Sequence, residues 1–192
     1  GSAYLSLWFK SSGESGTKAL AGFAKSGDAV RFTIYLQADG LVSAKDTGAT
    51  AGVEVNSLES LEANGWHKVD WVRVSSTERH LYIDGVLNAS STTDAGSISD
   101  SGNLPFTIGL RADDTNPADA STISLVHLSV TVPTATQIRQ MYDAEKPMFV
   151  ASAECLLQSS STDAVIDVDV DPLSGKVLVT QTDAITIFDD LA

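Results

Sequence analysis

One polar stretch of the chain groups side chains that could hold a metal ion. Residues 112–120 read ADDTNPADA, and the oxygen-bearing side chains among them are Asp113, Asp114, Asn116 and Asp119. Carboxylate and amide oxygens are the ligands that Ca²⁺ prefers. Asp, Asn and Pro are equally the ordinary residues of surface turns. The stretch therefore predicts either a calcium site or an ordinary surface turn. Asp113, Asp114 and Asn116 are also candidate ligand-binding residues, because they offer polar groups on a loop.

Carboxylates could also hydrolyse a glycosidic bond, which requires two of them about 5–5.5 Å apart in a retaining enzyme. A strand of the form Glu-x-Asp-x-x-Glu would supply such a pair. The nearest matches are Glu54-Val55-Asn56, which lacks the central Asp, and residues 167–171 (DVDVD), which contain no Glu. The Asp residues of 167–171 fall on one face of a strand, where charge discourages aggregation. The chain is therefore predicted to be non-catalytic.

Other catalytic and metal-binding motifs are absent from the sequence. The three histidines, His67, His80 and His127, show no His-x-x-x-His spacing, and no Gly-x-Ser-x-Gly or phosphate-binding Gly-Lys-Ser/Thr motif occurs. The single cysteine, Cys155, lies among apolar residues, is expected to be an inert buried thiol, and excludes an intrachain disulfide.

Aromatic side chains could stack against sugar rings. Residues 29–37 (AVRFTIYLQ) alternate as a strand, and this alternation places Tyr35 on the outward face. Tyr82 shares the outward face of a second predicted strand with His80. We predict that Tyr35 and Tyr82 are exposed and form the sugar platform.

The central element is a predicted hairpin over residues 65–85, GWHKVDWVRVSSTERHLYIDG. Its first strand alternates, with Val69, Trp71 and Arg73 on one face. Asp84-Gly85 predicts a tight turn into a third strand, since Gly accepts positive φ. Further strands are predicted over 3–10, 18–25, 29–37, 41–45, 104–111 and 121–132.

One helix is predicted, over residues 134–142. Thr134 and Gln137 have capping-box spacing. Ile138, Met141 and Tyr142 fall on one helical face, which should pack on a sheet.

The hairpin resembles the central hairpin of laminin-G-like, concanavalin A-type sandwiches. The residues that carry the resemblance are Trp66, His67, Val69, Leu81, Tyr82, Asp84 and Gly85. The resemblance extends from about Tyr4 to Tyr142 and includes the pattern Ile138-x-x-Met141-Tyr142. It implies an all-β, antiparallel jelly-roll β-sandwich with one short helix. Members of the family include lectins, adhesion modules, pentraxin-like proteins and glycosidases, so fold does not fix function.

The pattern of residues in the sequence changes after Pro147, and we place the domain boundary there. Residues 3–147 are predicted to form the sandwich, and residues 148–192 are predicted to form a β-rich C-terminal appendage. Residues 164–170, 176–182 and 184–188 read as short strands that resemble a single β-propeller blade. One blade cannot close a propeller, and an isolated hairpin is marginally stable. The appendage must therefore pack on the sandwich, pair with another chain, or be a truncated piece of a larger structure.

The charge and hydropathy of the chain exclude some classes of binding partner. The chain of 192 residues carries 12 Lys and Arg against 25 Asp and Glu, a net charge of −13, which argues against nucleic acid and anionic membrane surfaces. No apolar run reaches the length of a membrane span, so membrane insertion is not expected.

The predicted function is a recognition or adhesion module whose partner is a glycan or cell-surface receptor. The alternatives are a glycoside hydrolase of the same fold and a purely structural assembly domain. A laminin-G-like domain followed by a β-rich tail also resembles modules of bacteriophage tail fibres and tailspikes. That resemblance implies host recognition, a location at the virion surface or outside the cell, and a homotrimer.

Overall fold

The computed structural model describes residues 1–13, 15–24, 30–48, 50–61, 65–98, 105–111, 116–149, 163–171 and 176–188. The chain divides into two compact units, Gly1–Val150 and Ala151–Ala192.

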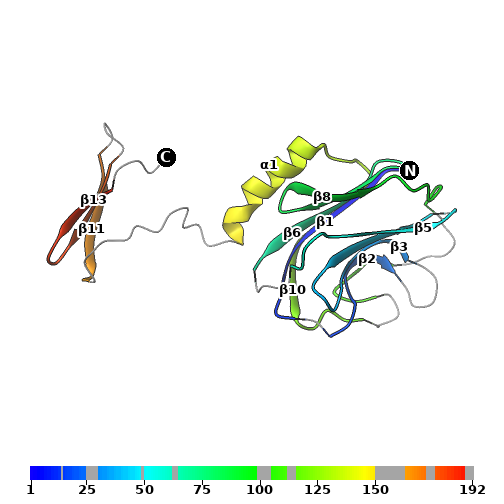
Figure 1. Cartoon of the computed structure of the whole chain (residues 1–192), viewed down its shortest axis with the longest axis horizontal. Coiled ribbons are helices and arrows are strands. Elements are labelled where there is room, and N and C mark those ends of the chain that lie inside the picture. Colours follow the sequence, from blue (N-terminus) through cyan, green and yellow to red (C-terminus); the bar gives the residue numbers. More distant parts are fainter. Residues whose placement is uncertain are drawn as a thin grey trace. The chain divides into compact units, whose positions relative to one another are not determined.

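The first unit is a sandwich of two five-stranded sheets in which every strand pairing is antiparallel (Figure 1). Sheet A has the order β10-β1-β6-β7-β8, with bounds Ser121–Ser129, Ala3–Ser11, His67–Arg73, Arg79–Ile83 and Val86–Ser91. Sheet B has the order β5-β4-β3-β2-β9, with bounds Gly52–Asn56, Val42–Thr47, Val30–Leu36, Lys18–Ala24 and Thr107–Ile108. The predicted antiparallel sandwich is thus confirmed.

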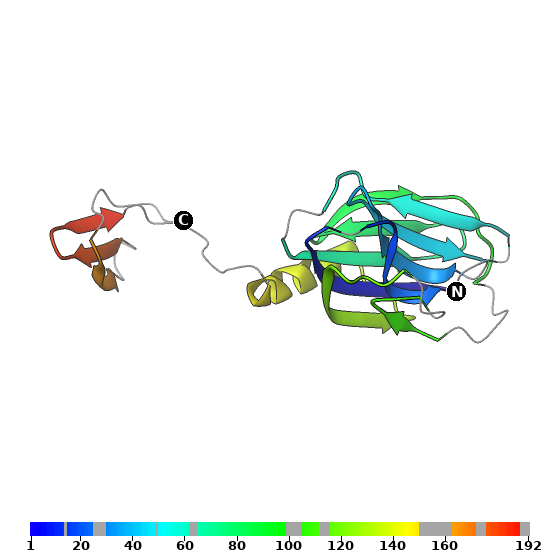
Figure 2. The ribbon, with the colours of Figure 1, turned by 90° about the horizontal axis from the view of Figure 1, so that it is seen from below.

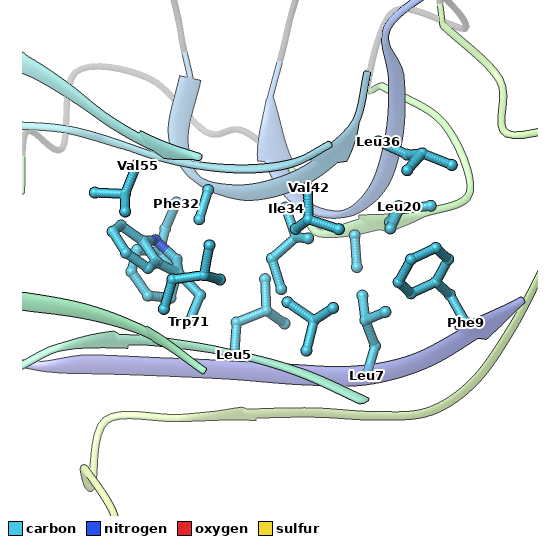
Figure 3. Packing of buried hydrophobic residues seen from close by; sticks show 14 of the residues in the cluster. Leu5, Leu7, Phe9, Leu20, Phe32, Ile34, Leu36, Val42, Val55 and Trp71 are labelled. Carbon is cyan, nitrogen blue, oxygen red and sulfur yellow. The ribbon is translucent and has the colours of Figure 1, made fainter. Parts of the chain in front are cut away.

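The apolar core lies between the two sheets (Figure 3). Alternation in β1 sends Leu5, Leu7 and Phe9 inward, where they face Ile34 and Leu36 of β3. All five side chains have no accessible surface. Because each buried aliphatic or aromatic side chain contributes about 1.5–3 kcal/mol, these alternating strands supply most of the driving force for the sandwich.

A buried ionic cluster crosses the same interface. Asp46 on β4 of sheet B accepts hydrogen bonds from the guanidinium groups of Arg73 on β6 and Arg79 on β7 of sheet A. All three side chains are fully buried. Arg73 shares its face of β6 with Val69 and Trp71, as alternation predicts, and that face points into the core. The charge of Arg73 is tolerated there because a carboxylate pairs with it.

The Asp84-Gly85 turn has the predicted geometry, with φ values of 51° and 74° at its two central residues. The Asp84 carboxylate then reaches back to the start of β6. It accepts a 2.8 Å hydrogen bond from the backbone N–H of Lys68 and lies 2.8 Å from Nδ1 of His67. His67 and Lys68 therefore hold the turn against the start of β6.

One predicted strand is shorter than expected. Of the described residues in 104–111, Thr107 and Ile108 pair with β2, and Gly109 then takes a φ of 78°. A left-handed residue turns the backbone away from the sheet, which ends the strand.

Helix α1 (Ala135–Glu145) lies on the outer side of sheet A, away from β2 and β3 (Figure 1). Its capping box is formed by Thr134 and Gln137, as predicted. Ile138 has no accessible surface and packs in a cluster with Tyr4, Val72 and Tyr82. A 3₁₀ turn, η1 (Lys146–Met148), follows.

The second unit contains a three-stranded antiparallel sheet of β11 (Val165–Val170), β12 (Val177–Gln181) and β13 (Ile185–Phe188) (Figure 2). The predicted β-rich appendage is thus present. The six residues of β11 are all exposed.

Candidate functional site

Polar side chains gather on the outer face of sheet B. In β4 and β5 alternate residues face away from the core, and antiparallel register sets Lys45 opposite Glu54 and Ser43 opposite Asn56. Gln37 joins them from the end of β3. We call Gln37, Ser43, Lys45, Glu54 and Asn56 the polar ladder. The strands of sheet B bow toward the core, so the ladder lies on the concave side of the sheet (Figure 3).

Glu54 is the centre of the polar ladder. Its Oε2 atom lies 3.0 Å from Nζ of Lys45, and its Oε1 atom accepts a 2.5 Å hydrogen bond from the Ser43 hydroxyl. The Gln37 amide donates to Glu54 Oε1 at 3.3 Å and to Asn56 Oδ1 at 3.0 Å. The side chains of Lys45 and Glu54 are 32% and 40% exposed, so a ligand can reach them.

Tyr35 lies beneath this ladder, with the ammonium of Lys45 5.4 Å from its ring centroid. Tyr35 is 3% exposed and packs against Ala19, its register partner on β2. The prediction that Tyr35 is exposed is therefore wrong. Alternation placed it on the outer face correctly, but neighbouring side chains cover that face, so Tyr35 supports the ladder and its ring is not an open platform.

Tyr82 belongs to the opposite sheet. It is 8% exposed and packs with Tyr4, Val72 and Ile138 under helix α1. Burial raises the pKa of Tyr82, and the charges of Asp70 and Glu78 raise it further. The predicted exposure of Tyr82 is wrong because α1 covers this side of sheet A, and the two tyrosines do not form one site.

The predicted calcium-binding stretch is described in part. Asp113 and Asp114 lie outside the described residues. Asn116 has a φ of 53°, and its carbonyl accepts a 3.1 Å hydrogen bond from Ala19 N–H, which brings it beside the strand that packs on Tyr35. Asp119 is exposed in a turn. In the described parts of the chain, no three His, Cys, Asp or Glu side chains are grouped to hold a metal, and calcium stays a prediction.

The polar ladder suits reversible binding of a hydroxylated ligand. The amides of Gln37 and Asn56 and the charged groups of Lys45 and Glu54 are at least partly accessible, and each can exchange an internal hydrogen bond for one to a ligand. The Ser43 hydroxyl is buried and holds the Glu54 carboxylate in place. Among the described residues of β3, β4 and β5, the outer face carries one carboxylate, Glu54, since Asp46 faces the core. One carboxylate does not make the pair that glycoside hydrolysis requires.

Sequence reasoning missed the polar ladder because its members come from three strands. The signal was present in part, since the spacing of Ser43 and Lys45, and of Glu54 and Asn56, puts each pair on one face of a strand. What the sequence does not give is the register that aligns these pairs.

The part of the chain that the structure describes contains no helix with the length and hydropathy of a transmembrane segment.

Solved structures with a similar fold include carbohydrate-binding proteins. The CBM40 domain of the Ruminococcus gnavus IT-sialidase, solved bound to α2,3-sialyllactose, matches 73% of this chain and 82% of its own at 16% identity, with a TM-score of 0.60. The Trypanosoma rangeli sialidase matches 78% of this chain at 17% identity, with a TM-score of 0.56. The type G botulinum neurotoxin receptor-binding domain matches 75% of this chain and 38% of its own at 13% identity, with a TM-score of 0.52. At these identities the likeness concerns the fold, and this chain spans 24% of the sialidase.

Comparison of the sequence with curated proteins finds no match. The family model described as the concanavalin A-like lectin/glucanases superfamily matches residues 4–139, which include every strand of the sandwich. The antiparallel sandwich of the structure agrees with this match. The chain belongs to the concanavalin A-like lectin/glucanase superfamily.

Proposed function

We propose that this chain is a non-catalytic recognition module that binds a glycan on the outer face of sheet B. The observation that carries the proposal is the polar ladder, in which Lys45 and Glu54 are partly exposed and linked to three further hydrogen-bonding side chains. Sugars are recognised through dense hydrogen bonding of hydroxyl groups, and the ladder offers both donors and acceptors.

The similar solved structures support a glycan in preference to other ligands. Two come from sialidases, and the CBM40 domain was solved with a sialylated trisaccharide bound. In this chain the ammonium of Lys45 is the one cationic group of the described polar ladder, so an acidic sugar is a ligand class worth testing beside neutral ones.

A glycan array with sialylated and neutral oligosaccharides tests the proposal. We expect binding to at least one glycan. Lys45→Ala should lower the affinity at least about tenfold, since a hydrogen bond to a charged group contributes about 1.5–3 kcal/mol. Asn56→Ala should lower it about two- to tenfold, since a neutral hydrogen bond contributes about 0.5–1.5 kcal/mol. The matched control is Lys10→Ala, which removes the same charge from an exposed position on β1 of sheet A. A protein that binds no glycan, or whose binding is insensitive to the ladder substitutions, would refute the proposal.

Hydrolysis is the competing function, because sialidases are among the similar structures. The single carboxylate of the described ladder favours binding without turnover. A reducing-sugar assay on every glycan that binds separates the two, since a hydrolase would release sugar and a binding module would not. Sugar release that Glu54→Gln abolishes would establish the enzyme.

We further propose that the chain is part of an extracellular or virion-surface appendage, such as a phage tail fibre, and that it forms a homotrimer through its C-terminal sheet. What supports self-association is the exposure of large apolar side chains in that sheet, which are Val165, Ile166, Val168, Val170, Ile185 and Ile187. The number of three subunits rests on the resemblance to tail fibres. A single sheet gains stability when another layer covers its apolar face. Three copies of the chain would supply that layer.

A further inference from the structure

A cavity of about 480 Å³ opens on the outer side of sheet A, between strand β10 and helix α1. This is the opposite sheet from the one that carries the polar ladder. Its volume falls within the range of about 300–1,000 Å³ that is typical of small-molecule sites. Neither the ladder nor the trimer proposal accounts for it.

The interior of the cavity is apolar and fixed in position. Tyr4, Val132 and Met141 line it, and all three belong to the cluster that buries Ile138. The Tyr4 hydroxyl donates a 2.6 Å hydrogen bond to Asp70, which holds the ring at the bottom of the cavity. A ligand therefore meets a preformed apolar surface, which lowers the cost of binding.

The walls offer hydrogen-bonding groups. Gln137, Gln140 and Ala144 of α1 line one side because residues spaced by three, four and seven fall on one helical face. Gln137 is held by the capping box, through the 2.9 Å hydrogen bond from Thr134 N–H to its Oε1 atom, and its amide nitrogen can donate to a ligand. His127 of β10 lines the other side, with its ring 5.6 Å from that of Tyr4.

The charge of the lining residues restricts which ligands can bind in the cavity. The described residues that line the cavity include no Asp, Glu, Lys or Arg, and the chain as a whole carries a net charge of −13. The carboxylate of Asp70, which accepts the hydrogen bond of the Tyr4 hydroxyl, is paired with the buried ammonium of Lys68 at 3.0 Å, so this pair brings no net charge to the cavity. An anionic ligand would meet no Lys or Arg in the described lining, so a neutral ligand is favoured.

We propose that this cavity is a second saccharide site, which takes a neutral sugar that carries an N-acetyl group. The acetamido methyl group would rest on Met141 and Val132, and the sugar hydroxyls and the acetamido amide would exchange hydrogen bonds with Gln137 and Gln140. The proposal extends the lectin function to the opposite sheet and does not depend on the polar ladder.

The test is a titration followed by the backbone amide signals of the labelled protein in NMR spectra. The probes are N-acetylglucosamine and N-acetylgalactosamine, with glucose, galactose and N-acetylneuraminic acid for comparison. We expect the two N-acetylhexosamines to shift the signals of Gln140, Met141 and His127, and the three comparison sugars to shift them less. Equal shifts with all five sugars, or none at these residues, would overturn the proposal.

Ala144→Trp should fill the cavity mouth and abolish those shifts. Its matched control is Thr136→Trp, an exposed residue of the same helix that does not line the cavity, which should leave them unchanged. Signals of the sandwich core report that each variant remains folded. Shifts that survive in Ala144→Trp would place the sugar elsewhere. Shifts confined to the ladder around Lys45 would uphold the proposed function and refute this second site.

Discussion

The indole Nε1 of Trp8 donates a 2.7 Å hydrogen bond to Oε2 of Glu145, which joins the first strand of the sandwich to the last residue of its helix. The same carboxylate lies 3.5 Å from the buried ammonium of Lys68. Trp8 also stacks between Tyr142 and Phe149, with ring centroids 5.6 and 4.4 Å away. These contacts hold α1 against sheet A, and α1 forms one wall of the cavity described above.

Trp8→Phe should therefore destabilise the protein without unfolding it. The substitution keeps an aromatic ring for stacking but leaves the Glu145 carboxylate without its indole donor. Because hydrogen bonds to charged groups contribute about 1.5–3 kcal/mol, we expect the free energy of unfolding in urea to fall by about that amount. Asp143→Asn is the control, since it breaks the solvent-exposed i,i+4 pair with Arg139 and should change the free energy of unfolding far less than Trp8→Phe does. Equal effects of the two substitutions would contradict the assigned role of Trp8.

Asp46→Ala should be far more damaging, because it leaves the guanidinium groups of Arg73 and Arg79 buried without their carboxylate. Removal of one partner from a buried ionic cluster costs about 3–5 kcal/mol. We expect thermal unfolding to shift strongly downward, or soluble protein to be lost. Lys45→Ala, on the same strand but facing outward, separates this effect from general sensitivity of β4. A thermal midpoint unchanged by Asp46→Ala would show that the cluster does not stabilise the sandwich.

Alkaline pH should destabilise the protein through its buried tyrosines. The pKa values of Tyr4, Tyr82 and Tyr142 are raised above 10.0 in the folded protein, chiefly by burial. Above pH 10 the unfolded chain therefore loses phenolic protons that the folded chain retains, so stability falls as the pH rises. Each such group contributes a slope of up to about 1.36 kcal/mol per pH unit.

Tyr82→Phe tests this linkage, because the described contacts include no hydrogen bond of the Tyr82 hydroxyl that the substitution would remove. At pH 7 the variant should unfold at nearly the wild-type denaturant concentration, and above pH 10 it should lose stability less steeply. Chemical unfolding measured from pH 7 to 11.5, with phenolate absorbance as a second readout, checks both points. Parallel curves for the two proteins would show that Tyr82 titrates normally in the folded state.

The proposed trimer predicts a solution mass of three times the 20.2 kDa chain by light scattering. Val168 of β11 shares a sheet face with Val179, its register partner on β12. Val168→Asp places a charge on that face and should yield monomers. Val130→Asp makes the same change at an exposed position of the sandwich unit and should leave the mass unchanged. A monomeric wild-type chain would refute the trimer, and glycan binding by that monomer would leave the recognition function intact.

Local features of the structure were predictable from the sequence because short-range physics decides them. The turn at Asp84-Gly85 follows from glycine's access to positive φ, and the helix start at Thr134 follows from its spacing to Gln137. Alternation in residues 65–85 put Val69 and Trp71 on one face of a strand, and both lie in the core. These patterns, together with the Trp-His and Asp-Gly motif of the hairpin, were enough to predict the sandwich.

The candidate site could not be predicted in the same way. Alternation predicts on which face of a strand a side chain lies, but it does not predict what covers that face. For this reason the alternating pattern predicts exposed side chains for Tyr35 and Tyr82, and the structure buries both. The polar ladder depends on antiparallel register between β3, β4 and β5, which sets Glu54 against Lys45. Register between strands is a tertiary property, since it is fixed by packing on the core as well as by each strand's own pattern.

The sequence by itself determined the fold family, the alternating core and the capped helix, because each is encoded by residues close together in the chain. The tertiary structure decided which side chains meet. Arg73 pairs with a carboxylate from the other sheet, Glu145 with an indole 137 residues earlier, and the cavity lies between β10 and α1. Such contacts depend on how two sheets and a helix close around one core, so no local pattern in the sequence encodes them.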